Sequence, residues 1–291
     1  GCMKKFDLPY LEFMVMRNCN LSCEGCTTFS DHRHPGHYPT VEEIMTDLKS
    51  WSTRLNFDHL GTMGGEPLLN PHIEDILVQV REHFPNTTIR FVTNGLLLHK
   101  HKTLIDKMHQ LGNVIFKITK HVNDERVKSI VKYIMDRFDW EPVTEYNINR
   151  WLTTNSFRFQ INAPEKFFRT FKGTYFNMQP HDNNPVEAFE MCVQKTCPLL
   201  YQGKLFKCGT LALTPDMLSK MGQIEKPEWQ PYVNGGLALD SSDDALAKWI
   251  KNFGKPHAVC RQCPSRNDKE RQTVASNNSL QKRCRFLSKK N

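Results

Sequence analysis

Apolar positions in the first 165 residues follow two alternating patterns. Short apolar or β-branched runs bounded by Gly, Asn and Pro predict strands, and apolar residues spaced three or four apart predict amphipathic helices between them. The first helix carries a capping box, Thr40 with Glu43. The expected strands are 11–16, 57–63, 88–95, 113–119 and 157–162, and the expected helices are 40–55, 73–84, 104–111 and 127–138.

Strands that alternate with helices imply right-handed βαβ units and a parallel sheet, so the fold class is α/β. An open sheet and a barrel both fit this pattern. The alternation stops near residue 170, and the remainder is rich in Asn, Pro, Gly and Cys, with one hairpin-like pair around 199–209. We therefore expect a core over residues 1–170 and a small cysteine-rich module of short strands over 171–291. The last strand of the core is the exception, because a position after residue 170 also fits the pattern.

The composition is that of a globular protein. The chain has 291 residues, 39% hydrophobic and 24% charged, and a chain of this length needs no disulfides to be stable. Because no apolar run approaches the length of a membrane span, we expect a cytoplasmic protein with no membrane partner. The formal net charge is +8, with the surplus near the C-terminus. That basic tail fits either a nucleic-acid contact or a solvated end.

Ten cysteines change this picture because they are grouped. Three lie within 19–26, three within 192–208 and two within 260–263, whereas Cys2 and Cys284 stand apart. A chain of cytoplasmic composition does not need a disulfide framework, so the grouping favours metal or redox chemistry. Two metal sites are the simplest explanation.

The first group, Cys19, Cys23 and Cys26, follows the first strand directly. Ligands of parallel α/β folds bind at the carboxyl ends of the strands, and thiolates suit iron–sulfur clusters or zinc. In a [4Fe–4S] cluster these three cysteines leave the fourth iron open to an exogenous ligand. A structural zinc site requires a fourth protein ligand, for which three histidines are candidates. These are His32, His34 and His37.

A second signal, Gly64-Gly65-Glu66-Pro67, follows the second strand. Paired glycines permit close backbone approach to a ligand, and the glutamate offers an acceptor for an ammonium group. The tetrapeptide is a common turn when it stands alone. At the tip of strand two, beside a cysteine loop at the tip of strand one, it becomes specific.

The two motifs together resemble the radical S-adenosylmethionine (radical SAM) superfamily over roughly residues 10 to 165. The resemblance implies a partial (β/α)6 TIM-like barrel whose [4Fe–4S] cluster binds S-adenosylmethionine at the open iron. It further implies a 5′-deoxyadenosyl radical that abstracts hydrogen from the substrate, and an electron donor such as flavodoxin or ferredoxin. The residues it assigns to the cosubstrate are Gly64, Gly65 and Glu66 for the methionine amino group, Thr93, Asn94, Lys117 and Thr119 for the carboxylate or ribose, and Gln160 and Asn162 for the adenosine.

One position departs from the common family pattern. Many members have an aromatic residue immediately before the third cysteine, packed near the adenine, and this chain has Gly25 there. We expect Phe29 to take over that packing role.

The late cysteines resemble the abbreviated auxiliary-cluster module (twitch, or SPASM-like) of the same superfamily. The spacing runs Cys192-x10-Gly203-x4-Cys208, followed by Cys260-x2-Cys263. The ligands implied for a second [4Fe–4S] cluster are Cys192, Cys208, Cys260 and Cys263, and a zinc ribbon is the alternative because four thiolates bind zinc equally well. Cys197 is then a substitute for Cys192, a thiol that donates hydrogen to a substrate radical, or a small buried residue.

Basic residues near the expected cavity favour an anionic sugar- or nucleotide-type substrate. His32 is a candidate acid–base group, and Lys117, Lys120 and His121 end strand four. The predicted reaction is dehydrogenation or epimerisation of a small molecule. The alternatives are a radical SAM peptide-modifying enzyme and, from another class, a zinc-stabilised nucleic-acid-binding protein.

Overall fold

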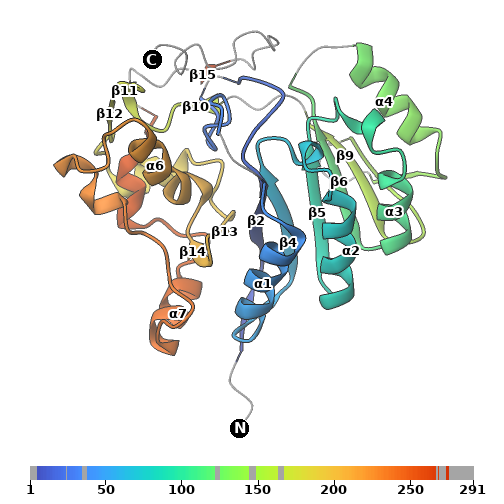
Figure 1. The fold of residues 1–291 in the computed structure, drawn as a ribbon, viewed down its shortest axis with the longest axis horizontal. Helices are drawn as coiled ribbons and strands as arrows, with labels where there is room; N and C mark the ends of the chain where they lie inside the picture. The colour runs from blue at the N-terminus through green and yellow to red at the C-terminus, as the bar shows by residue number, and fades with distance from the viewer. Residues whose placement is uncertain are drawn as a thin grey trace.

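The computed structural model describes residues 5–23, 25–34, 38–121, 125–143, 149–162, 167–266, 268 and 273–274. Its largest sheet has nine strands, and six of them run parallel as neighbours: β13, β2, β4, β5, β6 and β9 (Figure 1). In spatial order the strands are β14 (Lys204–Phe206), β13 (Leu199–Tyr201), β2 (Leu11–Met16), β4 (His59–Gly64), β5 (Thr88–Thr93), β6 (Val114–Thr119), β9 (Phe157–Asn162), β8 (Asn149–Leu152) and β7 (Glu141–Pro142).

Helices connect the parallel strands and cover the outer face of the sheet. The capping box predicted for α1 is present, since Thr40 Oγ1 accepts from the Glu43 N–H at 3.1 Å and Glu43 Oε2 accepts from the Thr40 N–H at 2.7 Å. The mixed α/β class predicted from the alternation is confirmed. The helices are α1 (Val41–Ser52), α2 (Ile73–His83), α3 (Leu104–Leu111) and α4 (Glu125–Met135), with short 3₁₀ turns η1 (Pro67–Leu69) and η2 (Leu98–Lys100).

The first helix is shorter than predicted. We expected it to reach Leu55, but that residue starts β3 (Leu55–Phe57), which pairs in parallel with β1 (Phe6–Leu8). Leu55 and Phe57 are buried on one side of this strand. Their alternation follows the strand period, so a strand partner from the N-terminal segment overrides the helical spacing.

Residues after 170 contain more helix than the short-strand module we expected. The hairpin of β13 and β14 is present and turns at Gln202 and Gly203, both with positive φ, and the Trp51 indole N–H donates to the Gly203 carbonyl at 2.9 Å. This contact ties the hairpin to α1. The remaining elements are α5 (Pro185–Glu190), α6 (Gly209–Lys220), α7 (Asp243–Lys251), the 3₁₀ helices η4 (Pro227–Tyr232) and η5 (Ala258–Gln262), and the strand pairs β11 (Lys172–Thr174) with β12 (Asn177–Gln179) and β10 (Phe167–Phe168) with β15 (Thr273–Val274).

The two largest apolar clusters of the described residues support these parts. The larger lies between the sheet and α1 to α3, and it includes Trp51, Phe91 and Phe116. The smaller packs under α6 around Leu213 and Trp229. Within the described ranges, none of the helices is long and apolar enough to cross a bilayer.

Candidate active site

The three early cysteines lie in the loop that begins directly after β2, and all three line a cavity of about 450 Å³. The Cys19 sulfur accepts a hydrogen bond from the Leu21 N–H at 3.4 Å, and the Cys26 sulfur lies 3.2 Å from the Thr28 hydroxyl. Apolar side chains, among them Leu21 and Leu96, pack around the loop. The loop therefore presents three thiols on one wall of a cavity with an apolar backing.

The chemistry of these thiols fits an iron–sulfur cluster. Burial raises the pKa of Cys19 and Cys26, and the negative charges of Glu66 and Asp31 respectively raise them further. A thiol in such surroundings ionises when a cation neutralises it, as the irons of a cluster do. Within the described part of the chain, no three His, Cys, Asp or Glu side chains are placed to hold a single metal ion. In a cluster each cysteine binds a different iron atom.

The glycine pair after β4 lies against the backbone of the cysteine loop. The Gly65 N–H donates to the Met16 carbonyl and the Glu66 N–H to the Asn18 carbonyl, both at 2.9 Å. A Cβ at Gly64 would lie 2.4 Å from the Met16 carbonyl oxygen, and one at Gly65 would lie 2.2 Å from that of Asn18. We expected these glycines to admit a ligand. In the structure they admit the neighbouring loop, while both residues also line the cavity.

Glu66 links the loops that follow β4 and β5. One carboxylate oxygen accepts from the Leu68 N–H at 2.9 Å and the Thr93 hydroxyl at 2.5 Å, and the other accepts from the Asn94 N–H at 2.8 Å. Burial raises the pKa of Glu66 to about 7, against these hydrogen bonds, which lower it. Because both oxygens already accept hydrogen bonds from the protein, Glu66 fixes the loop after β4 to the loop after β5.

Most of the residues assigned to the cosubstrate are brought together. Asn94 is oriented on both sides, since its amide donates to Asn20 Oδ1 at 2.8 Å and its carbonyl oxygen accepts from the Leu96 N–H at 3.0 Å. The predicted residues that line the cavity with the three cysteines are Gly64, Gly65, Glu66, Thr93, Asn94, Lys117 and Thr119.

Of the residues assigned to the cosubstrate or to acid–base chemistry, four do not line this cavity, and neither does Lys120. Gln160 and Asn162 lie on β9, where they pair with Lys117 and Thr119 in the sheet register but stay outside the lining. Phe29 is 1% exposed and packs against Phe171 and Tyr175, so its position does not support a contact with adenine. His32 is also buried and stacks edge-on against Tyr175.

The surroundings of His32 also argue against an acid–base role. Burial lowers its pKa to about 4, and the charge of Lys220 lowers it further. The imidazole is therefore neutral at physiological pH and does not line the cavity. His37, the third histidine considered for a zinc ion, lies outside the described residues, as do Cys2 and Cys284.

The sequence pattern missed several polar residues of the lining, among them Tyr10, Glu12 and Arg90. These three residues lie near one another in the lining, and Lys117 is close enough to Glu12 to act on its charge. The available signal was a glutamate inside the apolar run Leu11–Met16, which is unusual for a strand that packs against helices.

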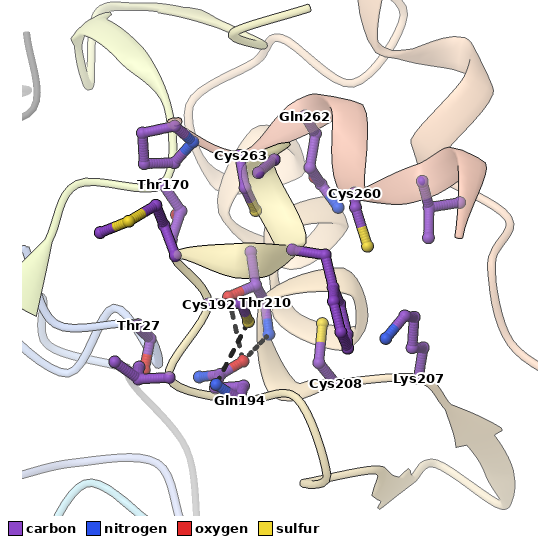
Figure 2. A pocket seen from close by; sticks show the side chains of 16 residues that line it. Thr27, Thr170, Cys192, Gln194, Lys207, Cys208, Thr210, Cys260, Gln262 and Cys263 are labelled. Carbon is purple, nitrogen blue, oxygen red and sulfur yellow. Dashed lines mark hydrogen bonds between the residues drawn. The ribbon is translucent and has the colours of Figure 1, made fainter. Parts of the chain in front are cut away.

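The late cysteines divide between two cavities. Cys192, Cys208, Cys260 and Cys263 line a second cavity of about 60 Å³ between α5, α6 and η5, shown in Figure 2. Cys197, the fifth, lines the first cavity instead. This separation supports Cys192 over Cys197 as a member of the late group.

Backbone N–H groups point at three of these four sulfurs. Cys192 accepts from the Gln194 N–H at 3.2 Å, and Cys208 and Cys260 accept at 3.5 Å from the first turn of α6 and from the His257 N–H. Such donors stabilise bound thiolates. Burial raises the pKa of Cys208 to about 12, and the other thiols raise it further, so this donor set also fits a cationic metal centre.

The two cavities share a wall. Thr27, Val193 and Gln194 line both of them. The Gln194 side chain is held there because its carbonyl oxygen accepts from the Thr210 N–H and hydroxyl at 3.3 Å (Figure 2). The two cavities therefore adjoin at these side chains.

Comparison with known proteins agrees with this geometry. Residues 13–145 match the family described as Radical SAM superfamily. GTP 3′,8-cyclase from Microcystis aeruginosa is 30% identical over 109 residues, covering 36% of this chain and 32% of the relative. Molybdenum cofactor biosynthesis protein 1 from Bos taurus is 29% identical over 140 residues, covering 47% of this chain and 21% of the relative. The matches thus span about a third or less of these curated relatives.

A solved structure extends the likeness of fold to nearly the whole chain. The crystal structure of BtrN in complex with AdoMet and 2-DOIA aligns with a TM-score of 0.53 and 15% identity, covering 94% of this chain and 100% of BtrN. The cysteine loop and the glycine loop both lie inside the matched family region. The match to the Radical SAM superfamily thus covers the part of the chain that holds both loops of the first cavity.

Proposed function

We propose that the protein is a radical SAM enzyme that oxidises or epimerises a small, anionic sugar- or nucleotide-type substrate. The observation that carries this proposal is the cavity of about 450 Å³, whose lining joins the three cysteines to the glycine loop and to the charged residues Glu12, Arg90 and Lys117. When bound, the cluster and S-adenosylmethionine supply a 5′-deoxyadenosyl radical that removes hydrogen from the substrate.

The chain's own residues divide this cavity into two ends. Cys19, Cys23 and Cys26 would hold the cluster, with S-adenosylmethionine along the loops that Glu66 and Asn94 fix in place. The other end carries the substrate. In this reading the parallel strands form a partial (β/α)6 barrel around the cavity, with a core over residues 1–170 and a cysteine-bearing module over 171–291.

Charge at the substrate end supports an anionic substrate. Arg90 and Lys117 line it, with His121 on the same cavity. Guanidinium and ammonium groups are the usual partners of phosphate and carboxylate. The curated relatives whose name states a substrate are GTP cyclases, which makes nucleotides reasonable first compounds to test.

The late cysteines would hold a second [4Fe–4S] cluster that accepts an electron from the substrate. Four half-buried thiols around one small cavity, which shares lining residues with the first cavity, support this role. The alternative, a single zinc ion, fits less well, because no three described His, Cys, Asp or Glu side chains are placed around one ion. With an electron acceptor so close, dehydrogenation is the favoured outcome. A reductant protein of the flavodoxin or ferredoxin type would supply the electron that starts the cycle.

Anaerobic reconstitution tests the proposal. Reduced protein should convert S-adenosylmethionine to 5′-deoxyadenosine, and the variant in which Cys19, Cys23 and Cys26 are all serine should not. Incubation with GTP and a panel of sugar phosphates, followed by mass spectrometry, should reveal a compound that loses two hydrogens. A colourless protein that forms no 5′-deoxyadenosine would overturn the proposal.

A further inference from the structure

The part of the cavity that we assign to the substrate contains the carboxyl group of Glu12. The proposed binding of the cluster and of S-adenosylmethionine does not involve this group. Glu12 lies on β2, where its neighbours Leu11 and Phe13 point into the core between sheet and helices. The parallel register pairs Glu12 with Gly61 of β4 and Gly61 with Arg90 of β5. Registered neighbours of a sheet face the same side, so these residues share the cavity side.

The chain makes room for a partner to this carboxyl. A Cβ at Gly61 would lie 2.1 Å from the Tyr10 hydroxyl, so any side chain there would displace the tyrosine. In the space left by Gly61, the Tyr10 hydroxyl donates to Glu12 Oε1 at 3.0 Å. The carboxyl is thus fixed from one side, and a dedicated glycine permits the contact.

Four titratable or charged groups face Glu12: Tyr10 beside β2, Arg90 of β5, Lys117 of β6 and Cys197 before β13. The Arg90 guanidinium lies 5.6 Å from the centre of the Tyr10 ring, and its buried Nε has no hydrogen-bond partner among the described residues. Burial raises the pKa of Glu12 to about 7, while the Tyr10 hydrogen bond and the positive charges of Arg90 and Lys117 lower it.

We propose that Glu12 is the general base of the reaction, held by Tyr10 and placed to accept a proton from a substrate hydroxyl. This inference rests on the proposed function and specifies its oxidative branch. A substrate carbon bearing a hydroxyl loses one hydrogen atom to the 5′-deoxyadenosyl radical. The resulting carbon radical loses the hydroxyl proton to Glu12 and one electron to an oxidised iron–sulfur cluster, so the carbon–oxygen single bond becomes a carbonyl.

The protonation behaviour fits this role. A general base works best when its pKa lies near the working pH, because it is then both ionised and basic enough to take a proton. Cys197 differs, since burial and the charge of Glu12 raise its pKa to about 12 and keep it a thiol. The same end of the cavity therefore holds a proton acceptor and a hydrogen-atom donor, and the product reveals which one acts.

A carboxyl titration tests the environment of Glu12 without any cluster or substrate. In full-length cluster-free protein labelled with ¹³C at the glutamate carboxyls, the resonances of Glu12 and Glu66 should both titrate near pH 7, and the one that vanishes in Glu12→Gln belongs to Glu12. Tyr10→Phe should raise its midpoint, because the lost hydrogen bond stabilised the ionised form. A midpoint near 4.5, the ordinary value, would overturn the proposal.

Product analysis tests the step itself. In reconstituted enzyme with the turned-over compound of the panel, Glu12→Gln should lower the ratio of oxidised product to 5′-deoxyadenosine by about 100-fold. Glu12→Asp should restore part of it, and the wild-type ratio should rise with pH through the midpoint seen by NMR. An unchanged ratio in Glu12→Gln would overturn the general-base role, whereas absence of 5′-deoxyadenosine in the wild type would overturn the proposed function instead.

Discussion

The two cysteine centres differ in how much space the protein leaves beside the sulfurs. The early thiols line a cavity of about 450 Å³, and a mixture of polar and apolar residues lines the rest. The late thiols surround a cavity of about 60 Å³ on several sides. Three donors beside a large volume suit a centre that binds another molecule, and four donors around a small one suit a centre that is complete without it. The difference predicts distinct chemistry for the two centres.

The largest effect should follow loss of the early centre. Cys23→Ser removes one of three donors, and a cluster held by two cysteines is not retained. We expect iron to fall by about four atoms per chain and 5′-deoxyadenosine formation to fall by at least about 1000-fold. Iron analysis measures the iron content, and chromatography measures the 5′-deoxyadenosine formed. Cys197→Ser is the matched control, and loss of iron in that variant would break the assignment of the sulfurs.

Loss of the late centre should abolish oxidation of the substrate while formation of 5′-deoxyadenosine continues. Cys263→Ser should remove about four further iron atoms yet leave formation of 5′-deoxyadenosine within about threefold of wild type. The oxidised product should disappear, because the electron acceptor is gone. Zinc in place of iron at this centre in the wild type would contradict the proposed electron transfer. Equal loss of both activities would show that the two centres are not separable.

The early centre was readable from the sequence because its parts are local. Cys19, Cys23 and Cys26 lie within eight residues, and the glycine loop needs only the adjacent strand to reach them. The α/β alternation was readable for the same reason, since each helix and strand carries its own period. The α1 boundary was missed because Leu55 is set by β1, nearly 50 residues earlier.

Features that depend on distant contacts were harder to predict. The surroundings of Glu12 depend on Gly61 and Arg90, which belong to two other strands. Spacing alone also left Cys192 and Cys197 as alternatives, and the fold separates them by turning one toward each cavity. Phe29 was assigned by analogy with a position in other proteins, whereas in this chain Phe171 and Tyr175 enclose it.

A smaller effect should come from the contact between the glycine and cysteine loops. Gly65→Ala forces a Cβ against a backbone oxygen that lies 2.2 Å away, so we expect the protein to lose about 2–4 kcal/mol of unfolding free energy. Gly222→Ala is the control. No atom lies within 4 Å of its added Cβ, and its φ of +68° should cost about 1–2 kcal/mol. Urea unfolding of both variants measures the difference, and equal values would contradict close packing of the two loops.

The smallest effect should be a change in the reduction potential of the late centre when a nearby positive charge is removed. Lys207 lines the late cavity and opposes the burial that raises the pKa of Cys192 and Cys208. A nearby cation favours the reduced, more negative form of a cluster, so Lys207→Met should lower the reduction potential of the late centre by tens of millivolts, on the order expected for one partly screened charge. The early centre does not have this lysine in its lining and should keep its potential. A redox titration followed by electron paramagnetic resonance resolves the two signals, and Lys207→Arg, which keeps the charge, should leave both unchanged. Equal shifts in both signals would mean that the centres share one electrostatic environment, and the contrast between them would then rest on ligand number alone.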